Sequence, residues 1–193
     1  RFNTTNAERL ARSSLSNSAC GVCGKKKLNL EAMQGLSPLV FSSPLSRQLL
    51  TSLPGELNKQ QTLFAHTGGL HAAALFDANG QLLAFREDVG RHNAVDKLTG
   101  WALLNDQLPL DERIVLLSGR ASFELIQKCI MARVSVVCAI SAPSSYAVRL
   151  AREFGITLVG FLRDGRFNIY AGAERILGSS YALPASVDNK RLA

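Results

Sequence analysis

The sequence predicts an α/β protein with a mixed, mainly parallel sheet and helices on both faces. Three observations support this class. Short apolar runs rich in β-branched residues alternate with segments whose apolar residues recur at helical spacing. One pair of runs is joined by a turn signal, which predicts a hairpin and therefore some antiparallel pairing. A length of 193 residues with 47% hydrophobic and 19% charged residues fits one domain with a core rather than a disordered chain.

The first part of the chain is polar and shows little periodicity. Residues 1–43 are rich in Ser, Asn, Gly and Lys, so we expect a flexible segment and linker at the end of a truncated N-terminal region. Leucines at helical spacing predict a helix over 44–57, with Pro44 near its first turn. The α/β domain is expected to span 44–178, and a poorly ordered tail is expected over 179–193.

A hairpin and then an alternation of helices and strands follow. The hairpin is predicted over 72–85, because Asn79-Gly80 separates two apolar runs and readily supplies the positive φ angles of a tight turn. Downstream we expect helices over 94–104, 122–132 and 144–154, and strands over 114–117, 134–140, 156–161 and, at a sheet edge, 167–170. Strand–helix–strand connections of this length favour right-handed crossovers and parallel pairing. Ser144 is a plausible N-cap and Gly155 a plausible stop for the third helix.

The charge balance and cysteine usage narrow the class of protein. The chain has 22 basic and 15 acidic residues, a formal net charge of +7 and a pI near 9.6, which suits an anionic partner. Neither RNP-like nor zinc-finger spacing occurs, so we expect no nucleic acid as partner. No apolar run approaches the roughly 20 residues that cross a bilayer, so no membrane is expected either. Only four cysteines, two of them as Cys-x-x-Cys, indicate a reducing, cytoplasmic setting.

Three loops carry small, polar or basic residues where predicted strands end. They are Ser118-Gly119-Arg120, residues 141–145 and residues 162–166. In open α/β sheets ligands bind beyond the carboxyl ends of the strands, and arginine forks with backbone amides at helix N-termini suit phosphate. We therefore expect an anionic, nucleotide-like ligand at one crevice, with contacts from Arg120, Ser141, Ser144 and Arg166.

The sharpest local feature is the pair Cys20 and Cys23, followed by Lys25-Lys26-Lys27. Nearby positive charge favours the thiolate, which is the nucleophilic form. The residues leave three uses open: half of a structural zinc site, disulfide exchange, or the carriage of sulfur. Zinc would need two further ligands, and without a second cysteine pair the candidates are His66, His71 and His92.

Two histidine-containing segments could contribute to a site. His66 is interpreted either as a residue of a glycine-rich loop facing the crevice or as a histidine satisfied by backbone groups at a strand start. A zinc deaminase would need His-x-Glu and a later Pro-Cys-x-x-Cys, yet residue 68 is glycine and the cysteine pair precedes the histidines. In the charged segment 86–97, Asp88 could cap a helix or hold His92 in one tautomer.

Five motifs occur in a fixed order: Cys20-Gly-Val-Cys-Gly-Lys, His66-Thr-Gly-Gly-Leu-His-Ala-Ala, Arg86-Glu-Asp-Val-Gly-Arg-His-Asn-Ala-Val-Asp-Lys, Ser118-Gly-Arg-Ala-Ser-Phe-Glu, and Gly160-Phe161 with Asn168-Ile-Tyr. Together they resemble the FdhD family, the sulfur carriers required for formate dehydrogenase activity. The resemblance covers roughly residues 15 to 170. Because members of this family usually carry a further N-terminal segment, we expect this chain to be part of a longer product.

The resemblance implies a sulfurtransferase. Such a protein takes persulfide sulfur from a cysteine desulfurase and passes it to the molybdenum cofactor, Mo-bis(molybdopterin guanine dinucleotide), of formate dehydrogenase. On the matching motif, Cys20 would carry the persulfide and Cys23 would be its partner.

The resemblance also implies a cytidine deaminase-like three-layer fold without the deaminase zinc, hence no structural metal, and a homodimer. The segment that matches the family's cofactor-binding stretch consists of Phe161, Leu162, Arg163, Asp164, Gly165 and Arg166, with GDP as the expected ligand analogue. Two other functions stay open: a zinc-dependent deaminase-like hydrolase, and a non-catalytic nucleotide- or cofactor-binding chaperone.

Overall fold

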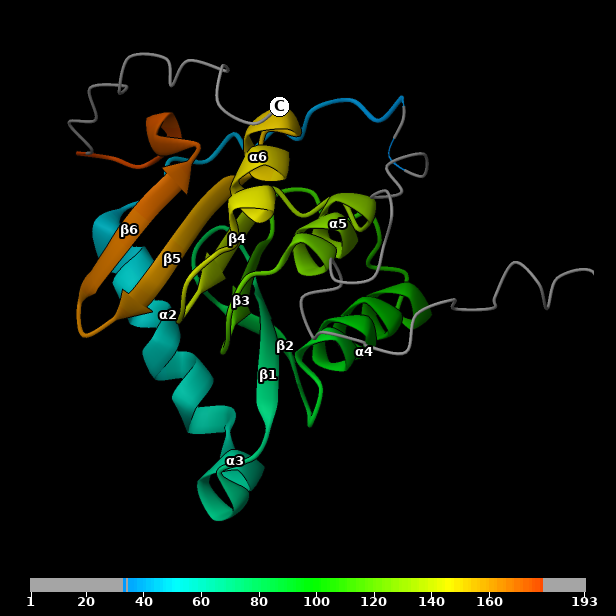
Figure 1. Ribbon diagram of the computed structural model, residues 1–193, viewed down its shortest axis with the longest axis vertical. Coiled ribbons are helices and arrows are strands. Elements are labelled where there is room, and N and C mark those ends of the chain that lie inside the picture. Colours follow the sequence, from blue (N-terminus) through cyan, green and yellow to red (C-terminus); the bar gives the residue numbers. More distant parts are fainter. Residues whose placement is uncertain (1–32, 34, 179–193) are drawn as a thin grey trace, which may run out of the picture.

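A single six-stranded sheet organises the protein. The computed structural model describes residue 33 and residues 35–178 (Figure 1). The strands are β1 (His71–Phe76), β2 (Leu82–Asp88), β3 (Ile114–Leu117), β4 (Val136–Ala139), β5 (Thr157–Arg163) and β6 (Arg166–Ala171). Their order across the sheet is β2–β1–β3–β4–β5–β6. The predicted edge strand over 167–170 is confirmed as β6.

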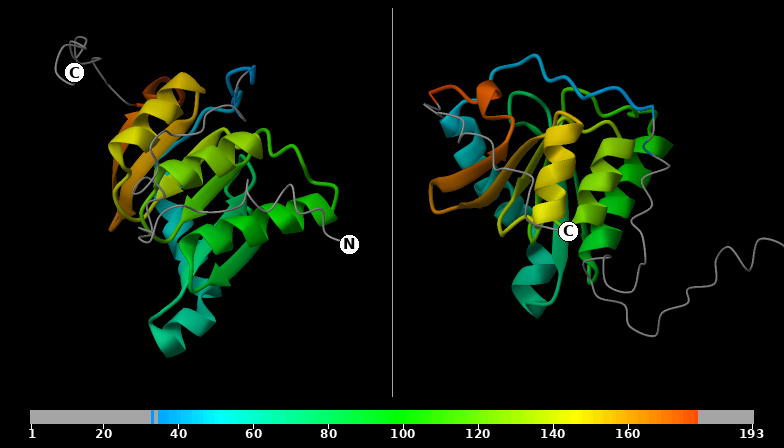
Figure 2. Two further views of the ribbon diagram at one scale, coloured as in Figure 1. Left: turned by 45° about the vertical axis from the view of Figure 1, so that its right-hand side comes forward. Right: turned by 45° about the horizontal axis from the view of Figure 1, so that its top comes forward.

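Helices cover both faces of this sheet. They are α2 (Arg47–Gln60), α3 (Thr62–Thr67), α4 (Arg91–Leu104), α5 (Phe123–Met131) and α6 (Ser145–Glu153), and a short 3₁₀ helix, η3 (Ala173–Arg175), follows β6. Helices α4, α5 and α6 lie on one face and α2 crosses the other, while α3 projects at the lower end of Figure 1 (Figures 1 and 2). None of the helices in the described part of the chain is long and apolar enough to cross a membrane.

The sheet is mixed, as predicted, but it is not mainly parallel. Only β3–β4 and β4–β5 pair in parallel, whereas β2–β1, β1–β3 and β5–β6 are antiparallel. The antiparallel pairing beyond the predicted hairpin comes from β1 beside β3 and from a second hairpin at the β5–β6 turn. Asp164 and Gly165 both have positive φ, 53° and 69°, which is the backbone of a two-residue type I′ turn. The loop predicted over residues 162–166 is therefore a hairpin turn.

Each face of the sheet buries its own core, because side chains alternate between the two faces along a strand. On the α2 face, Leu50, Leu53 and Leu57 pack in one cluster with Phe76 and Leu116. On the opposite face, strand residues alternating with these pack with apolar residues of the other helices, among them Ala73, Leu75, Leu117, Val95, Ile126 and Leu150. Because β3, β4 and β5 are parallel, their carboxyl ends lie at the same edge of the sheet, between the two helical layers.

The helix boundaries follow local capping signals. Ser46 Oγ accepts a hydrogen bond from the Leu49 amide at 3.0 Å, so α2 begins three residues after Pro44 rather than at it. Ser144 caps α6 as predicted, since its Oγ accepts from the Ala147 amide at 3.2 Å. Gly155 follows α6 with φ +70° and is confirmed as its stop signal.

Residues 35–43 run across the domain. Leu39 and Phe41 are buried, and the Leu39 amide donates to the Phe154 carbonyl at 2.8 Å. The guanidinium of Arg175 also donates to the carbonyl of Leu39, at 3.1 Å. This part of the predicted linker thus contributes to the core, while residues 1–32 and the predicted tail over 179–193 lie outside the described residues.

Candidate functional site

Loops that follow β3 and β4, together with the end of β5, form one hydrogen-bonded edge. The Ser141 amide donates to the Gly119 carbonyl at 3.3 Å, and the Phe161 amide donates to the Ser141 carbonyl at 3.2 Å. The Ser144 amide donates to the Ala121 carbonyl at 2.9 Å. The three stretches predicted to share a site thus adjoin at this edge, which we call the carboxyl edge.

Gly160 allows the loop after β4 to lie against β5. A Cβ atom at residue 160 would lie 2.8 Å from Pro143 Cδ, 2.9 Å from Tyr170 Cε2 and 3.3 Å from the Ser141 carbonyl oxygen. The next residue, Phe161, has φ 53°, which is uncommon for a residue with a side chain, and β5 departs from regular pairing between Gly160 and Arg163. The backbone at the start of the predicted cofactor segment is therefore bent.

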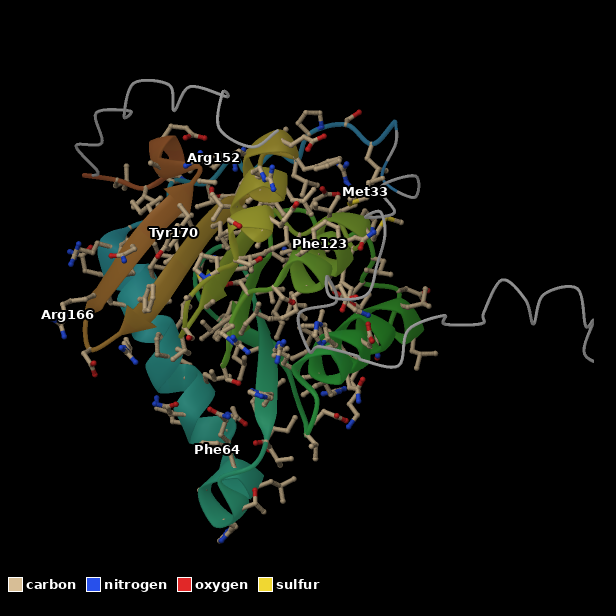
Figure 3. All side chains as sticks on the ribbon, in the orientation of Figure 1. Met33, Phe64, Phe123, Arg152, Arg166 and Tyr170 are labelled. Atoms are coloured by element: carbon tan, nitrogen blue, oxygen red, sulfur yellow. The ribbon has the colours of Figure 1, made fainter. Side chains whose placement is uncertain are left out.

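The residues of the predicted cofactor segment lie in two different environments. The Leu162 side chain is fully buried in the core facing α2, so a ligand would meet its neighbours rather than Leu162 itself. Residues 163–166 are exposed at the hairpin tip, where Figure 3 labels Arg166. Arg47 steadies this tip, since its Nη2 donates to the Gly165 carbonyl at 3.4 Å and its guanidinium lies 5.1 Å from the centre of the Phe167 ring.

Basic side chains gather on the other side of the carboxyl edge, around the start of β1. His71 pairs with Asp88 of β2, and its ring lies against Gly119, where a Cβ would be 3.2 Å from His71 Nδ1. Burial lowers the pKa of His71, and the charges of Arg91 and Arg120 lower it further. We call His71, Arg91 and Arg120 the basic cluster.

The structure corrects the surroundings predicted for His66, but it does not test whether His66 contacts a ligand. His66 lies in helix α3, not in a loop, and every residue of that helix is exposed. The short helix was missed because its six residues offer too little periodicity. His71 could have been found, because it has the same strand parity as the inward-facing Ala73 and Leu75 and begins β1 at the carboxyl edge.

Asp88 fixes the turn that leads into α4, but it is not the cap of that helix, whose N-cap residue is Gly90. Asp88 Oδ1 accepts from the Gly90 amide at 2.8 Å and from Asn93 Nδ2 at 3.0 Å, while Oδ2 lies 2.6 Å from Lys97 Nζ. His92 does not bond to Asp88. Its Nε2 lies 3.2 Å from Ser122 Oγ and 3.3 Å from Glu124 Oε2, so His92 connects α4 to the start of α5.

These contacts of Asp88 predict that the free energy of unfolding decreases in acid. Hydrogen bonds from Lys97, and then from Gly90 and Asn93, lower the pKa of Asp88 to about 2. Because this is below the unfolded value of about 3.9, the ionised group stabilises the protein above about pH 4, and that contribution is lost as the pH falls toward 2. We expect Asp88→Asn to reduce the free energy of unfolding at pH 7 and to flatten its fall between pH 4 and pH 2. Urea titrations at several pH values measure both, and Asp164→Asn controls for the loss of one surface carboxylate. An unchanged acid slope in Asp88→Asn would exclude this role.

Two of the four cysteines cannot serve as nucleophiles in the folded protein. Cys129 and Cys138 are free but buried, and burial raises the pKa of each to about 12. Cys20 and Cys23 lie outside the described residues. Among the residues that are described, no group of three or more His, Cys, Asp or Glu side chains is placed to hold a metal ion.

Burial of these thiols gives a direct reactivity prediction. In the variant Cys20→Ala/Cys23→Ala, we expect Ellman's reagent to titrate no thiol at pH 8 in native protein and two thiols after unfolding. The reason is that a thiol with a pKa of about 12 is ionised in only about one molecule in ten thousand at that pH, and it is also shielded from the reagent. Rapid labelling of native Cys129 or Cys138, located by peptide mass mapping, would contradict this placement.

Comparisons with known proteins agree with the motifs. Residues 1–177 match the FdhD/NarQ family. Proteins named Sulfur carrier protein FdhD from Streptomyces coelicolor and Mycolicibacterium paratuberculosis are 53% and 51% identical over 169 and 168 residues. Each alignment covers 86% of this chain and 60% or 62% of the relative, so the chain spans about three-fifths of their length.

The fold has a solved counterpart. A crystal structure described as a putative formate dehydrogenase accessory protein, from Desulfotalea psychrophila, superimposes with a TM-score of 0.68 at 33% sequence identity. The match covers 76% of this chain and 62% of that one. With the family match extending over nearly the whole sequence, the chain belongs to the FdhD/NarQ family.

Proposed function

We propose that this chain is a sulfur carrier that matures formate dehydrogenase. Sulfur from a cysteine desulfurase is held as a persulfide on Cys20 and delivered to Mo-bis(molybdopterin guanine dinucleotide), the substrate that later serves the dehydrogenase. The observation that carries the proposal is the identity of about 50% to proteins named sulfur carriers, in a chain that contains Cys20-Gly-Val-Cys23. We further propose that it works as a cytoplasmic homodimer on a scaffold related to the cytidine deaminase fold.

The cysteine inventory supports Cys20 and Cys23 as the sulfur-handling residues. Cys129 and Cys138 are excluded as nucleophiles by burial and by their raised pKa values of about 12. Lys25, Lys26 and Lys27 follow the remaining pair. Their charge favours the thiolate that accepts sulfur and the persulfide anion that results.

The proposed loading step is a thiol exchange. The Cys20 thiolate attacks the outer sulfur of the desulfurase persulfide, so a new S–S bond forms on Cys20 as the donor's S–S bond breaks. The desulfurase leaves as a thiolate, which takes a proton from water. No net oxidation occurs, because the sulfur keeps its oxidation state while it moves from one cysteine to the other.

The proposed delivery step uses Cys23. Its thiolate attacks Sγ of Cys20 and the Cys20–Cys23 disulfide forms, while the outer sulfur takes a proton from water and leaves as hydrosulfide with the bonding electron pair. The outer sulfur is thereby reduced by two electrons and the two cysteines are oxidised. A cellular dithiol must then reduce the disulfide before the next cycle.

The carboxyl edge is the proposed place for the substrate. The proposed contacts come from the loops after β3 and β4, which are hydrogen-bonded to each other and to Phe161, and from the turn that follows Phe161. They are Arg120, Ser141, Ser144 and the exposed part of residues 161–166. A guanine nucleotide is the expected minimal ligand, with GDP as its analogue. The positive φ of Phe161 within this segment is the kind of backbone strain that gathers at ligand sites.

A transfer assay with labelled sulfur tests the function. Desulfurase, [³⁵S]cysteine, this chain and sulfur-deficient formate dehydrogenase are mixed, and we expect label in the molybdenum cofactor together with formate oxidation. Omission of either the chain or the desulfurase should leave both at background. Label that reaches the dehydrogenase equally well without this chain would overturn the proposal, as would stoichiometric zinc in the purified protein with deaminase activity on a nucleobase.

A further inference from the structure

The basic cluster brings three basic side chains from three parts of the fold to one end of β1. His71 is the first residue of β1, Arg91 is the first residue of α4, and Arg120 lies in the loop between β3 and α5. His71 alternates with Ala73 and Leu75, whose side chains pack under α4, α5 and α6, so His71 faces the same layer. The absence of a side chain at Gly119 gives its ring room against the β3–α5 loop.

We propose that the basic cluster binds the phosphate groups of a nucleotide-type substrate, and that His71 takes up a proton as they bind. This inference rests on the proposed function, because it assigns a subsite and a proton-coupled residue to the same substrate. Guanidinium groups bind phosphate oxygens in a bidentate manner, and a protonated imidazole adds a third charged donor.

The electrostatics around His71 explain why the proton would arrive with the ligand. Burial and the charges of Arg91 and Arg120 lower the pKa of His71, which favours the neutral ring in the free protein. An anion between the two guanidinium groups offsets their positive charge and favours the protonated ring.

Two acidic groups lie near the cluster. Asp88, which faces His71 across the β1–β2 pair, bonds to Lys97, Gly90 and Asn93. On the α5 side, Glu124 lies 3.3 Å from His92. Neither of these contacts joins a carboxylate to His71, and the proposal assigns the charge that favours its protonated form to the bound anion.

The position of the cluster also predicts the length of the substrate. Between β1 and β5 the sheet has three strand-to-strand steps, through β3 and β4. At roughly 4.8 Å a step, His71 lies about 14 Å from the strand that carries residues 161–163. A ligand that reaches both must be extended, as a pyrophosphate-linked dinucleotide is.

Isothermal titration with diguanosine pyrophosphate tests the proton uptake. This probe has no phosphate group that titrates near neutral pH, so a linked proton belongs to the protein. Binding is measured at pH 7 in two buffers with different ionisation enthalpies. We expect the binding enthalpy to differ between buffers in proportion to an uptake of up to one proton, and the affinity to rise about tenfold from pH 8 to pH 6.

Variants assign the proton. His71→Gln should abolish the buffer dependence and the pH dependence, whereas His92→Gln, a change at the histidine that connects α4 to the start of α5, should retain both. Arg120→Gln, an exposed residue, should weaken binding about tenfold without loss of folding, as checked by thermal unfolding. No binding of the probe, no proton uptake by the wild type, or uptake that persists in His71→Gln would each overturn the proposal. Sulfur loading of Cys20 is measured separately, so failure of this subsite and failure of the sulfur carrier function give different results.

Discussion

Replacing Cys20 with alanine is expected to abolish the activation of formate dehydrogenase, a loss of at least about a hundredfold, because Cys20 is the proposed sulfur acceptor and the buried Cys129 and Cys138 cannot replace it. Cys138→Ala is the matched control, since Cys138 is buried in the core of the α2 face and its thiol has a raised pKa of about 12. That control should retain full activation even though removal of the buried thiol leaves a small void. Activity is read as formate oxidation after reconstitution with desulfurase and cysteine.

Cys23→Ala separates the loading step from the delivery step. We expect this variant to accept sulfur on Cys20 at a normal level but to deliver it about ten times more slowly, because the attacking thiolate is missing. Loading is measured by mass and delivery by formate oxidation in the same samples. Loading and delivery that both match the wild type would remove the proposed role of Cys23 and leave direct transfer from Cys20 as the mechanism.

Gly160→Ala is expected to have the largest effect on the carboxyl edge. The added Cβ would lie 2.8 Å from Pro143 Cδ and 3.3 Å from the Ser141 carbonyl oxygen, so the loop after β4 must move away from β5. Overpacking of this kind costs about 1–3 kcal/mol in the free energy of unfolding. Since Ser141 connects Gly119 to Phe161, we also expect weaker binding of GDP.

Gly100→Ala provides the comparison for Gly160→Ala. Gly100 lies in α4 and nothing would come within 4 Å of its added Cβ. Alanine in place of glycine in a helix is expected to stabilise the protein by up to about 1 kcal/mol. Urea unfolding and GDP titration measure the stability and the GDP affinity of both variants. If Gly160→Ala unfolds like the wild type and binds GDP as tightly, the carboxyl edge does not depend on this close approach.

Secondary structure was predictable wherever the run of apolar residues was clear, or where the residues that begin and end an element are adjacent to it in the sequence. Strand β3 was predicted with its observed limits, and the capping residue Ser144 and the stop residue Gly155 frame α6 as expected. In the first hairpin Asn79-Gly80 does form the turn, but only Gly80 has positive φ, and Asp77 Oδ1 accepts from the amides of Asn79 and Gln81. The turn is thus fixed by a side chain that the dipeptide signal did not include.

The direction of the strands was harder to predict, because pairing depends on contacts far apart in the sequence. The sequence around each strand does not show that β1 lies beside β3, or that Asp164-Gly165 forms a hairpin turn rather than a binding loop. The same limit applies to the site. The importance of Cys20 could be read from its motif, whereas the meeting of Arg91 and Arg120 around His71 depends on that pairing.

The most direct test of the account is the mass of the intact chain after incubation with a cysteine desulfurase and cysteine. Sulfur carriage predicts a gain of about 32 Da, the mass of one sulfur atom, which dithiothreitol removes and which Cys20→Ala does not acquire. A chain that gains no sulfur under these conditions, or that gains it equally well without Cys20, would contradict the central claim.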